Sequence, residues 1–271
     1  MAAAVLAGTL FPVLGSAAEP VQSLRIAAAA DLEPLLPGVI AEFKQVHAGL
    51  DVSASYQSSA TLATQIVNGA PFDLFLAADL SFPQRVIAAG LGDATEPTPY
   101  ARGTLVLWAR KDSRFQPVSM AALQAASLKS VAMANPEHAP YGRAAKAAIA
   151  NLGLAESLGL KVVVAENIAQ AAQFVDSGNA ELGFISLTAA LSERLKADGT
   201  FVEVPANAYP AILQGAVVIK GSANVKLARD FLAYLLSPAV QRELAAGGLK
   251  APGGATSSGP QSPAPAAGLR R

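Results

Sequence analysis

The chain has 271 residues, which is enough to bury a sizeable core in one large or two medium domains. Its 20 basic and 20 acidic residues balance, so it lacks the positive excess with which proteins bind nucleic acid or anionic membranes. Cysteine is absent, which excludes disulfides and thiolate sites, and two histidines are too few for a typical histidine-rich zinc site.

The two ends of the chain differ from the part between them. Residues 1–18 are typical of an export signal: an apolar stretch is followed by small residues before a cleavage point at Glu19, although the usual positive start is missing. A buried N-terminal helix is the alternative, since the run is shorter than the roughly 20 residues that span a bilayer. Residues 251–271 are rich in Pro, Gly, Ser and Ala, which predicts a disordered tail. We therefore expect a soluble, exported protein.

Strands and helices alternate between these ends. Predicted strands cover residues 24–28, 51–56, 74–77, 105–108, 130–133, 161–164, 182–185 and 214–219. Helical patterns lie between them, among them 35–43, 61–68, 83–89 and 143–151, and a last one covers 227–246. This alternation predicts an α/β fold with two mainly parallel sheets flanked by helices. In such folds ligands bind beyond the carboxyl ends of the strands.

Four of the predicted helices begin with small or hydrogen-bonding residues and without a basic cluster. The junctions are AADL at 29–32, YQSSAT at 56–61, NPEHAPYG at 135–142 and ENI at 166–168. A helix start carries unpaired N–H groups and about half a positive charge, so several of them together bind an anion without lysine or arginine. Hydroxyls of Ser58, Ser59 and Tyr141 would add donors. Each residue also has a plain structural interpretation, the serines and Asn167 as N-caps and Tyr141 as a packing residue.

Motifs of common enzymes are absent from the sequence. It has no G-x-S-x-G, G-x-G-x-x-G, Walker or H-E-x-x-H pattern. Neither His47 nor His138 has a recognisable partner for a catalytic triad, and His138 is expected to stabilise its loop. Asp73 and Asp79 are expected to be turn or cap residues. We therefore expect a binding protein, not an enzyme, with an esterase-type enzyme on the same fold as the less favoured alternative.

Taken together, five segments resemble the periplasmic molybdate-binding proteins of ABC transporters. They are AAAADL at 27–32, SSATLATQI at 58–66, NGAPFDLF at 68–75, NPEHAPYG at 135–142 and ENIAQ at 166–170, in family order within a resemblance that covers roughly 24–250. The resemblance implies a two-lobed type II binding-protein fold with a hinge, in which residues 24–103 and 213–250 form lobe 1 and residues 104–212 form lobe 2. It implies crossover strands near 103–108 and 211–218. It also implies a periplasmic monomer without a cofactor that delivers its anion to a membrane permease.

The same resemblance implies the site residues. Ser59, Tyr141 and the backbone N–H of Ile168 would contact the oxygens of molybdate or tungstate, with Asp31 and Ala30 in the first loop and Ser58 beside Ser59. No side chain is expected to bind a metal ion directly. Ser186 stands where some relatives have a tyrosine donor, a function that Tyr141 could take.

Asp31 departs from the family, because many relatives have serine or asparagine there. A carboxylate ~4 Å from one oxyanion charge would cost about 4 kcal/mol at an effective dielectric constant of about 20. We therefore expect its carboxylate to turn away and cap its own helix. Neutral donors suit a fully ionised dianion, whereas Asp31 could accept the proton of hydrogen phosphate. Sulfate, thiosulfate and phosphate thus stay open as ligands, and the sequence does not separate molybdate from tungstate.

Overall fold

The computed structural model describes residues 22–47 and 49–253 of the chain. The predicted export signal at residues 1–18 lies outside the described residues, and so does all of the predicted tail except residues 251–253. Within the described ranges no helix is both long and apolar enough to cross a membrane.

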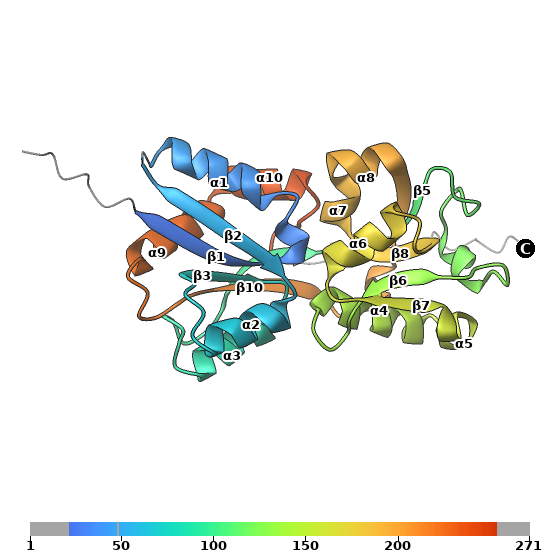
Figure 1. Cartoon of the computed structure of the whole chain (residues 1–271), viewed down its shortest axis with the longest axis horizontal. Helices are drawn as coiled ribbons and strands as arrows, with labels where there is room; N and C mark the ends of the chain where they lie inside the picture. Colours follow the sequence, from blue (N-terminus) through green and yellow to red (C-terminus); the bar gives the residue numbers. More distant parts are fainter. Residues whose placement is uncertain (1–21, 48, 254–271) are drawn as a thin grey trace, which may run out of the picture.

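Two five-stranded sheets with flanking helices form two lobes that lie side by side (Figure 1). The sheet of the first lobe has the order β2-β1-β3-β10-β4, formed by β1 (Ser23–Ala29), β2 (Asp51–Gln57), β3 (Leu74–Ala77), β4 (Thr98–Gly103) and β10 (Ile212–Val218). The sheet of the second lobe has the order β7-β6-β8-β5-β9, formed by β5 (Leu105–Arg110), β6 (Val131–Ala134), β7 (Val162–Ala165), β8 (Leu182–Ser186) and β9 (Gly199–Glu203). The predicted two-lobed architecture is confirmed.

Each sheet is mixed, but four of its five strands run in one direction, which confirms the prediction of mainly parallel sheets. In the first lobe β1 pairs in parallel with β2 and β3, but β10 is antiparallel to β3 and β4. The second lobe repeats this pattern, with β6 parallel to β7 and β8 and with β5 antiparallel to β8 and β9. Parallel pairs need a crossover helix. The strands by which the chain passes between the lobes have none, and they run antiparallel.

The chain passes between the sheets twice. Thr104 alone separates β4 from β5, and residues 204–211 separate β9 from β10. These two short connections hold the lobes together covalently.

Helices cover both faces of each sheet (Figure 1). The first lobe has α1 (Leu36–Gln45), α2 (Ser59–Val67), α3 (Ser81–Ala88), α9 (Val225–Leu235) and α10 (Pro238–Ala246), and a 3-10 turn, η1 (Ala30–Leu32). The second lobe has α4 (Pro140–Asn151), α5 (Ala155–Leu158), α6 (Ile168–Asp176), α7 (Leu187–Leu191) and α8 (Glu193–Asp198), and 3-10 turns η2 (Met120–Gln124), η3 (Gly159–Lys161) and η4 (Ala206–Ala208).

Buried apolar side chains hold α2 and α6, whose first turns line the site, against the sheets. Leu62, Ala63 and Ile66 of α2 are buried in one cluster with Phe75 of β3. In α6, Ala171 and Val175 belong to the core of the second lobe. Because each of these helices packs its apolar stripe on a sheet, its first turn is held at the edge where the strands end.

Candidate oxyanion site

Twelve residues line a small cavity between the two lobes, with an empty volume of about 200 Å³. All six residues predicted for the site are among them, and none is more than 4% exposed: Ala30, Asp31, Ser58, Ser59, Tyr141 and Ile168. The remaining lining residues are Ala29, Gln57, Ala78, Ala139, Pro140 and Asn167. Segments that are more than 100 residues apart in the sequence therefore meet in one place.

The lining comes from the ends of parallel strands in both lobes. In the first lobe, η1 follows β1 and α2 follows β2; in the second, α4 follows β6 and α6 follows β7. The carboxyl ends of these strands face the junction, and the helix starts bring their unpaired N–H groups there.

The two serines at the start of α2 differ in function. Ser58 is the N-cap: its Oγ accepts a hydrogen bond from the Thr61 N–H at 3.3 Å and lies 2.7 Å from Thr61 Oγ1. Ser59 Oγ accepts from the Ala78 N–H at 3.0 Å. No acceptor among the described residues takes the hydroxyl hydrogen of Ser59. This hydrogen is therefore available to an anion in the cavity.

The start of α6 offers a backbone donor. Asn167 is its N-cap, with Oδ1 accepting from the Gln170 N–H at 2.9 Å. Ile168 is the first residue of the helix, so its N–H has no acceptor within the helix. The start of α4 offers less, because Pro140 has no N–H.

The Asp31 carboxylate does not cap its own helix, so that expectation was wrong. Its Oδ2 accepts hydrogen bonds from Tyr141 Oη at 3.1 Å and from Gln214 Nε2 at 2.5 Å, whereas Oδ1 is buried without a partner. Asp31 lies inside η1, whose N-cap is Ala29, and no side-chain hydrogen bond caps this turn. Two side-chain donors from other elements bind the carboxylate instead. Thr188 Oγ1 also donates to the Asp31 carbonyl at 2.7 Å, which fixes the turn against the second lobe.

Burial raises the pKa of Asp31 to about 6. The hydrogen bonds from Gln214 and Tyr141 act in the opposite direction, because they stabilise the ionised form, but desolvation outweighs them. Burial and the charge of Asp31 together raise the pKa values of Tyr141 and Tyr100 well above their usual range, so both phenols stay neutral.

Gln214 is the residue of the site that the sequence analysis missed. It lies fully buried in β10, and its Oε1 has no partner. A glutamine within the apolar run ILQGAVV was the available signal, because a buried amide needs polar partners.

The structure also shows what the predicted donor Tyr141 and the departure at Ser186 contact. The Tyr141 hydroxyl donates to Asp31 and packs against Gly103, where a side chain would clash with it. Ser186 does not line the cavity; its Oγ lies 2.9 Å from Thr188 Oγ1 and accepts from the Ala189 N–H at 3.2 Å, at the start of α7.

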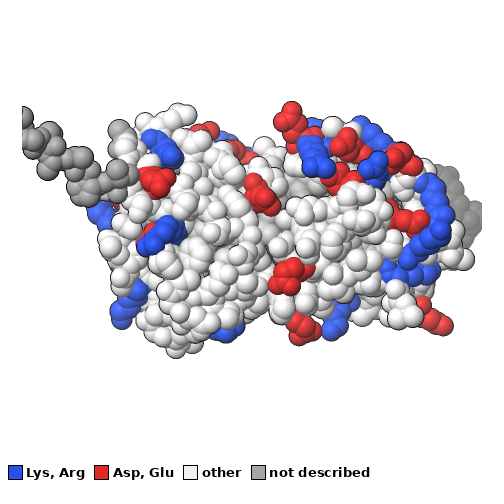
Figure 2. Space-filling model, in the orientation of Figure 1, with Lys and Arg blue, Asp and Glu red and all other residues white. Residues whose placement is uncertain are grey.

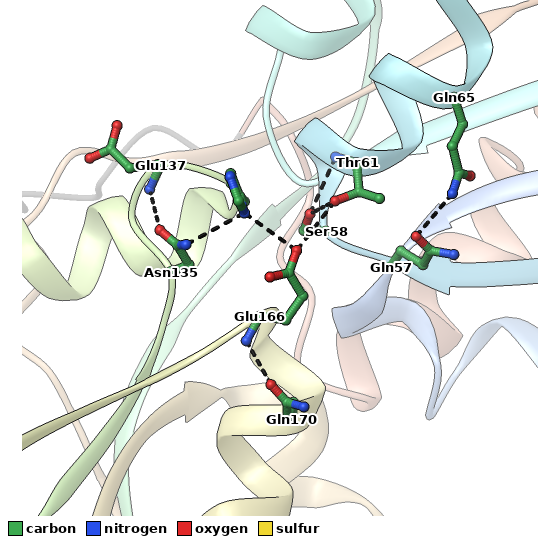
Figure 3. A network of polar contacts seen from close by, with 9 residues as sticks. Gln57, Ser58, Thr61, Gln65, Asn135, Glu137, Glu166 and Gln170 are labelled. Atoms are coloured by element: carbon green, nitrogen blue, oxygen red, sulfur yellow. Dashed lines mark hydrogen bonds and ion pairs between the residues drawn. The ribbon is translucent and has the colours of Figure 1, made fainter. Parts of the chain in front are cut away.

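Polar contacts close the lobes over the cavity (Figure 3). The Ala60 N–H in α2 donates to the His138 carbonyl at 3.1 Å, and Thr61 Oγ1 donates to Glu166 Oε1 at 3.4 Å. His138 Nδ1 lies 3.3 Å from the same Glu166 oxygen, so the histidine supports its loop as expected. An ion pair between Arg143 and Asp79 adds a further link between the lobes.

The cavity has no basic lining. Asp31 is its only ionisable group besides Tyr141, and among the described residues no cluster of three or more His, Cys, Asp or Glu could hold a metal ion. On the face drawn in Figure 2, Lys and Arg gather at the far end of the second lobe and not over the junction. An anion in the cavity would therefore be bound by neutral donors.

Residues 24–250 match the family model described as bacterial extracellular solute-binding protein. The chain belongs to this family. It is 35% identical to the molybdate-binding protein ModA of Azotobacter vinelandii over 79% of this chain and 84% of the relative. It is also 35% identical to ModA of Rhodobacter capsulatus, over 70% and 73% of the two chains. The structure of the Azotobacter vinelandii periplasmic molybdate-binding protein superposes with a TM-score of 0.75 and 30% identity, covering 83% of this chain and 98% of the other.

The membership fits the geometry of the cavity. Solute-binding proteins of this type hold a ligand in an enclosed space between two lobes and close around it. The relatives are binding proteins and not enzymes, which confirms the prediction that this chain is a binding protein.

Proposed function

We propose that this solute-binding protein captures molybdate or tungstate in the cavity between its lobes and delivers it to the membrane permease of an ABC transporter. The observation that supports the proposal most strongly is the enclosure of Ser59, Ile168 and the η1 turn around one cavity with neutral donors. The names of the relatives supply the identity of the anion.

Neutral donors suit a fully ionised tetrahedral anion because every oxygen of such an anion accepts hydrogen bonds. The expected donors are the Ser59 hydroxyl, the Ile168 N–H and the N–H groups of Ala30 and Asp31. These four charge-assisted bonds at ~1.5–3 kcal/mol each would give roughly 6–12 kcal/mol before the costs of association. Association and lobe ordering remove several kcal/mol of this gain. The upper end of the balance corresponds to about micromolar binding.

The proposed mechanism is closure about a hinge. We assign residues 24–103 and 213–250 to lobe 1 and residues 104–212 to lobe 2, so the connections at Thr104 and at 204–211 would be the hinge. An anion that contacts both Ser59 and Ile168 would favour the closed state, because only that state brings the two donors together. We place this cycle in the periplasm, with the protein acting as a monomer and without a cofactor.

One observation favours a second ligand class. Asp31 lines the cavity, and a carboxylate accepts the proton of hydrogen phosphate. Another oxyanion, phosphate first and then sulfate, is therefore the alternative ligand for the same site.

The proposal is tested by calorimetric titration of residues 19–271 with molybdate, tungstate, sulfate and phosphate. We expect one-to-one binding of molybdate and tungstate at micromolar or lower concentrations and much weaker binding of the other two. Tight binding of phosphate or sulfate alone would mean that the ligand is that anion and that the protein still acts as a solute-binding protein. Hydrolysis of phosphate or sulfate esters by the purified protein would contradict a transport function.

A further inference from the structure

Asp31 lines the cavity, and one of its carboxylate oxygens has no hydrogen-bond partner among the described residues. Its Oδ2 already accepts two hydrogen bonds, from Tyr141 and Gln214, whereas Oδ1 is buried and has no partner. The side chain is 1% exposed, so water outside the closed lobes does not reach it freely. An ionised carboxylate oxygen only accepts hydrogen bonds, so it could pair with an oxygen of an anion only through a shared proton.

The groups that face Asp31 cannot neutralise it. Tyr141 of α4 and Tyr100 of β4 are the titratable neighbours, and both stay neutral. Gln214 of β10 and Thr188 of α7 are uncharged, and Glu33 on its own turn is exposed. No lysine, arginine or histidine in the described residues forms a hydrogen bond or ion pair with Asp31. A dianion placed beside the ionised carboxylate would therefore meet an uncompensated like charge.

We propose that the oxyanion binds together with one proton, which lies between Asp31 Oδ1 and an oxygen of the anion. This inference rests on the proposed function, since it concerns the same cavity. The two donors on Oδ2 leave no room for a proton there, so the proton belongs on Oδ1. Asp31 in its protonated form is then a further donor to the anion.

The proposal predicts how affinity depends on pH. In the empty site the Asp31 pKa is about 6, so at pH 7.5 the carboxyl is mostly ionised and must gain a proton when the anion binds. Affinity for molybdate should then fall roughly tenfold per pH unit above about pH 7. Below about pH 5 the carboxyl is already protonated, and the pH dependence from this group should vanish.

The number of protons taken up can be measured directly. Molybdate is titrated into the mature chain at pH 7.5 in two buffers that differ in ionisation enthalpy, and the difference in heat gives the protons bound per anion. We expect close to one proton for the native protein at pH 7.5 and close to zero at pH 5. Asp31→Asn, which keeps a donor and cannot titrate, should bind molybdate with no proton uptake. Glu33→Gln is the matched control, because it removes an exposed carboxylate two residues away; it should keep the native uptake.

The outcomes separate this inference from the proposed function. Molybdate binding by the native protein without proton uptake at pH 7.5 would overturn the inference and leave the function intact. Equal uptake in native protein and Asp31→Asn would overturn it as well. If no oxyanion bound at all, the proposed function would fail, and the inference with it. The native protein alone decides the question at the two pH values if the Asp31 variant does not fold.

Discussion

The cavity combines one acidic side chain with donors that carry no charge. Asp31 is held through Oδ2 by Tyr141 and Gln214, Ser59 accepts a backbone N–H and keeps its own hydrogen, and Ser58 caps its helix. Replacement of Ser58 should therefore mainly lower stability, whereas replacement of Ser59 should mainly lower the affinity for the anion.

Ser59→Ala should lower the affinity for molybdate roughly ten- to hundredfold, because it removes one hydrogen bond to a charged ligand. Ser58→Ala is the control. It should cost about 1 kcal/mol of stability through the lost cap and affect binding less. Titration calorimetry and thermal unfolding of both variants check this. If the two serines lost affinity equally, the assignment of the Ser59 hydroxyl to the anion would be wrong.

Asp31 should also make the stability of the ligand-free protein depend on pH. Its folded pKa of about 6 lies above the usual aspartate value of 3.8, so the folded state binds the proton more tightly than the unfolded state. The stability linked to this proton is fully present below about pH 4 and is lost as the pH rises through 6, by up to about 3 kcal/mol. Urea unfolding of native protein and Asp31→Asn gives the free energy of unfolding of each. The value for the variant should therefore rise relative to the native value as the pH goes from 4 to 7. A constant gap would show that the carboxyl titrates normally.

The six residues that the resemblance implied for the site lie in local motifs at helix starts, and all six line the cavity. The sequence did not predict their partners. The bond between Asp31 and Gln214 joins residues 183 positions apart, and no local pattern specifies such a pairing. The expectation for Asp31 was wrong for the same reason, since it considered only donors on its own turn.

The site is formed by the first turns of helices. Apolar strands such as β1, β3 and β8 were predicted from their side chains alone. β4 (TPYARG) and β9 (GTFVE) were missed because neither is a clear apolar or alternating run. The predicted helix at 227–246 is two helices, because Ser237 and Pro238 begin α10.

The backbone donor of α6 can be removed without breaking the helix. Proline is tolerated at the first helical position, so Ile168→Pro should keep α6 and abolish the N–H that faces the cavity. Ile168→Val keeps that N–H and is the matched control. We expect the proline variant to bind molybdate at least tenfold more weakly than the valine variant, the effect of one charge-assisted bond. Equal affinities in titration, with helix content preserved by circular dichroism, would exclude the Ile168 N–H from the site.

At the scale of the whole molecule, the mixed sheets reflect how the chain joins its two lobes. The parallel order of β2-β1-β3 and of β7-β6-β8 follows from local βα units, which the sequence displays. The antiparallel strands depend on where the chain crosses between lobes, which is a long-range property.

The inter-lobe ion pair should adjust closure without forming the site. Arg143→Gln removes the partner of Asp79, and a partly exposed pair is worth at most about 1 kcal/mol, so affinity should fall no more than about fivefold. The change should appear as faster release of the anion, measured by stopped flow. Lys146→Gln on the same helix is the control, because its partner Glu137 lies in the same lobe. Equal effects of both variants would mean that charge on α4, and not the inter-lobe contact, controls release.

We infer that one tetrahedral oxyanion binds between the lobes. Anomalous diffraction from crystals grown with molybdate would show where the molybdenum atom lies. We predict a single molybdenum peak in the cavity, with oxygens within hydrogen-bond distance of Ser59 Oγ, the Ile168 N–H and Asp31 Oδ1. A peak elsewhere on the surface, or a closed cavity without one at saturating molybdate, would contradict the account.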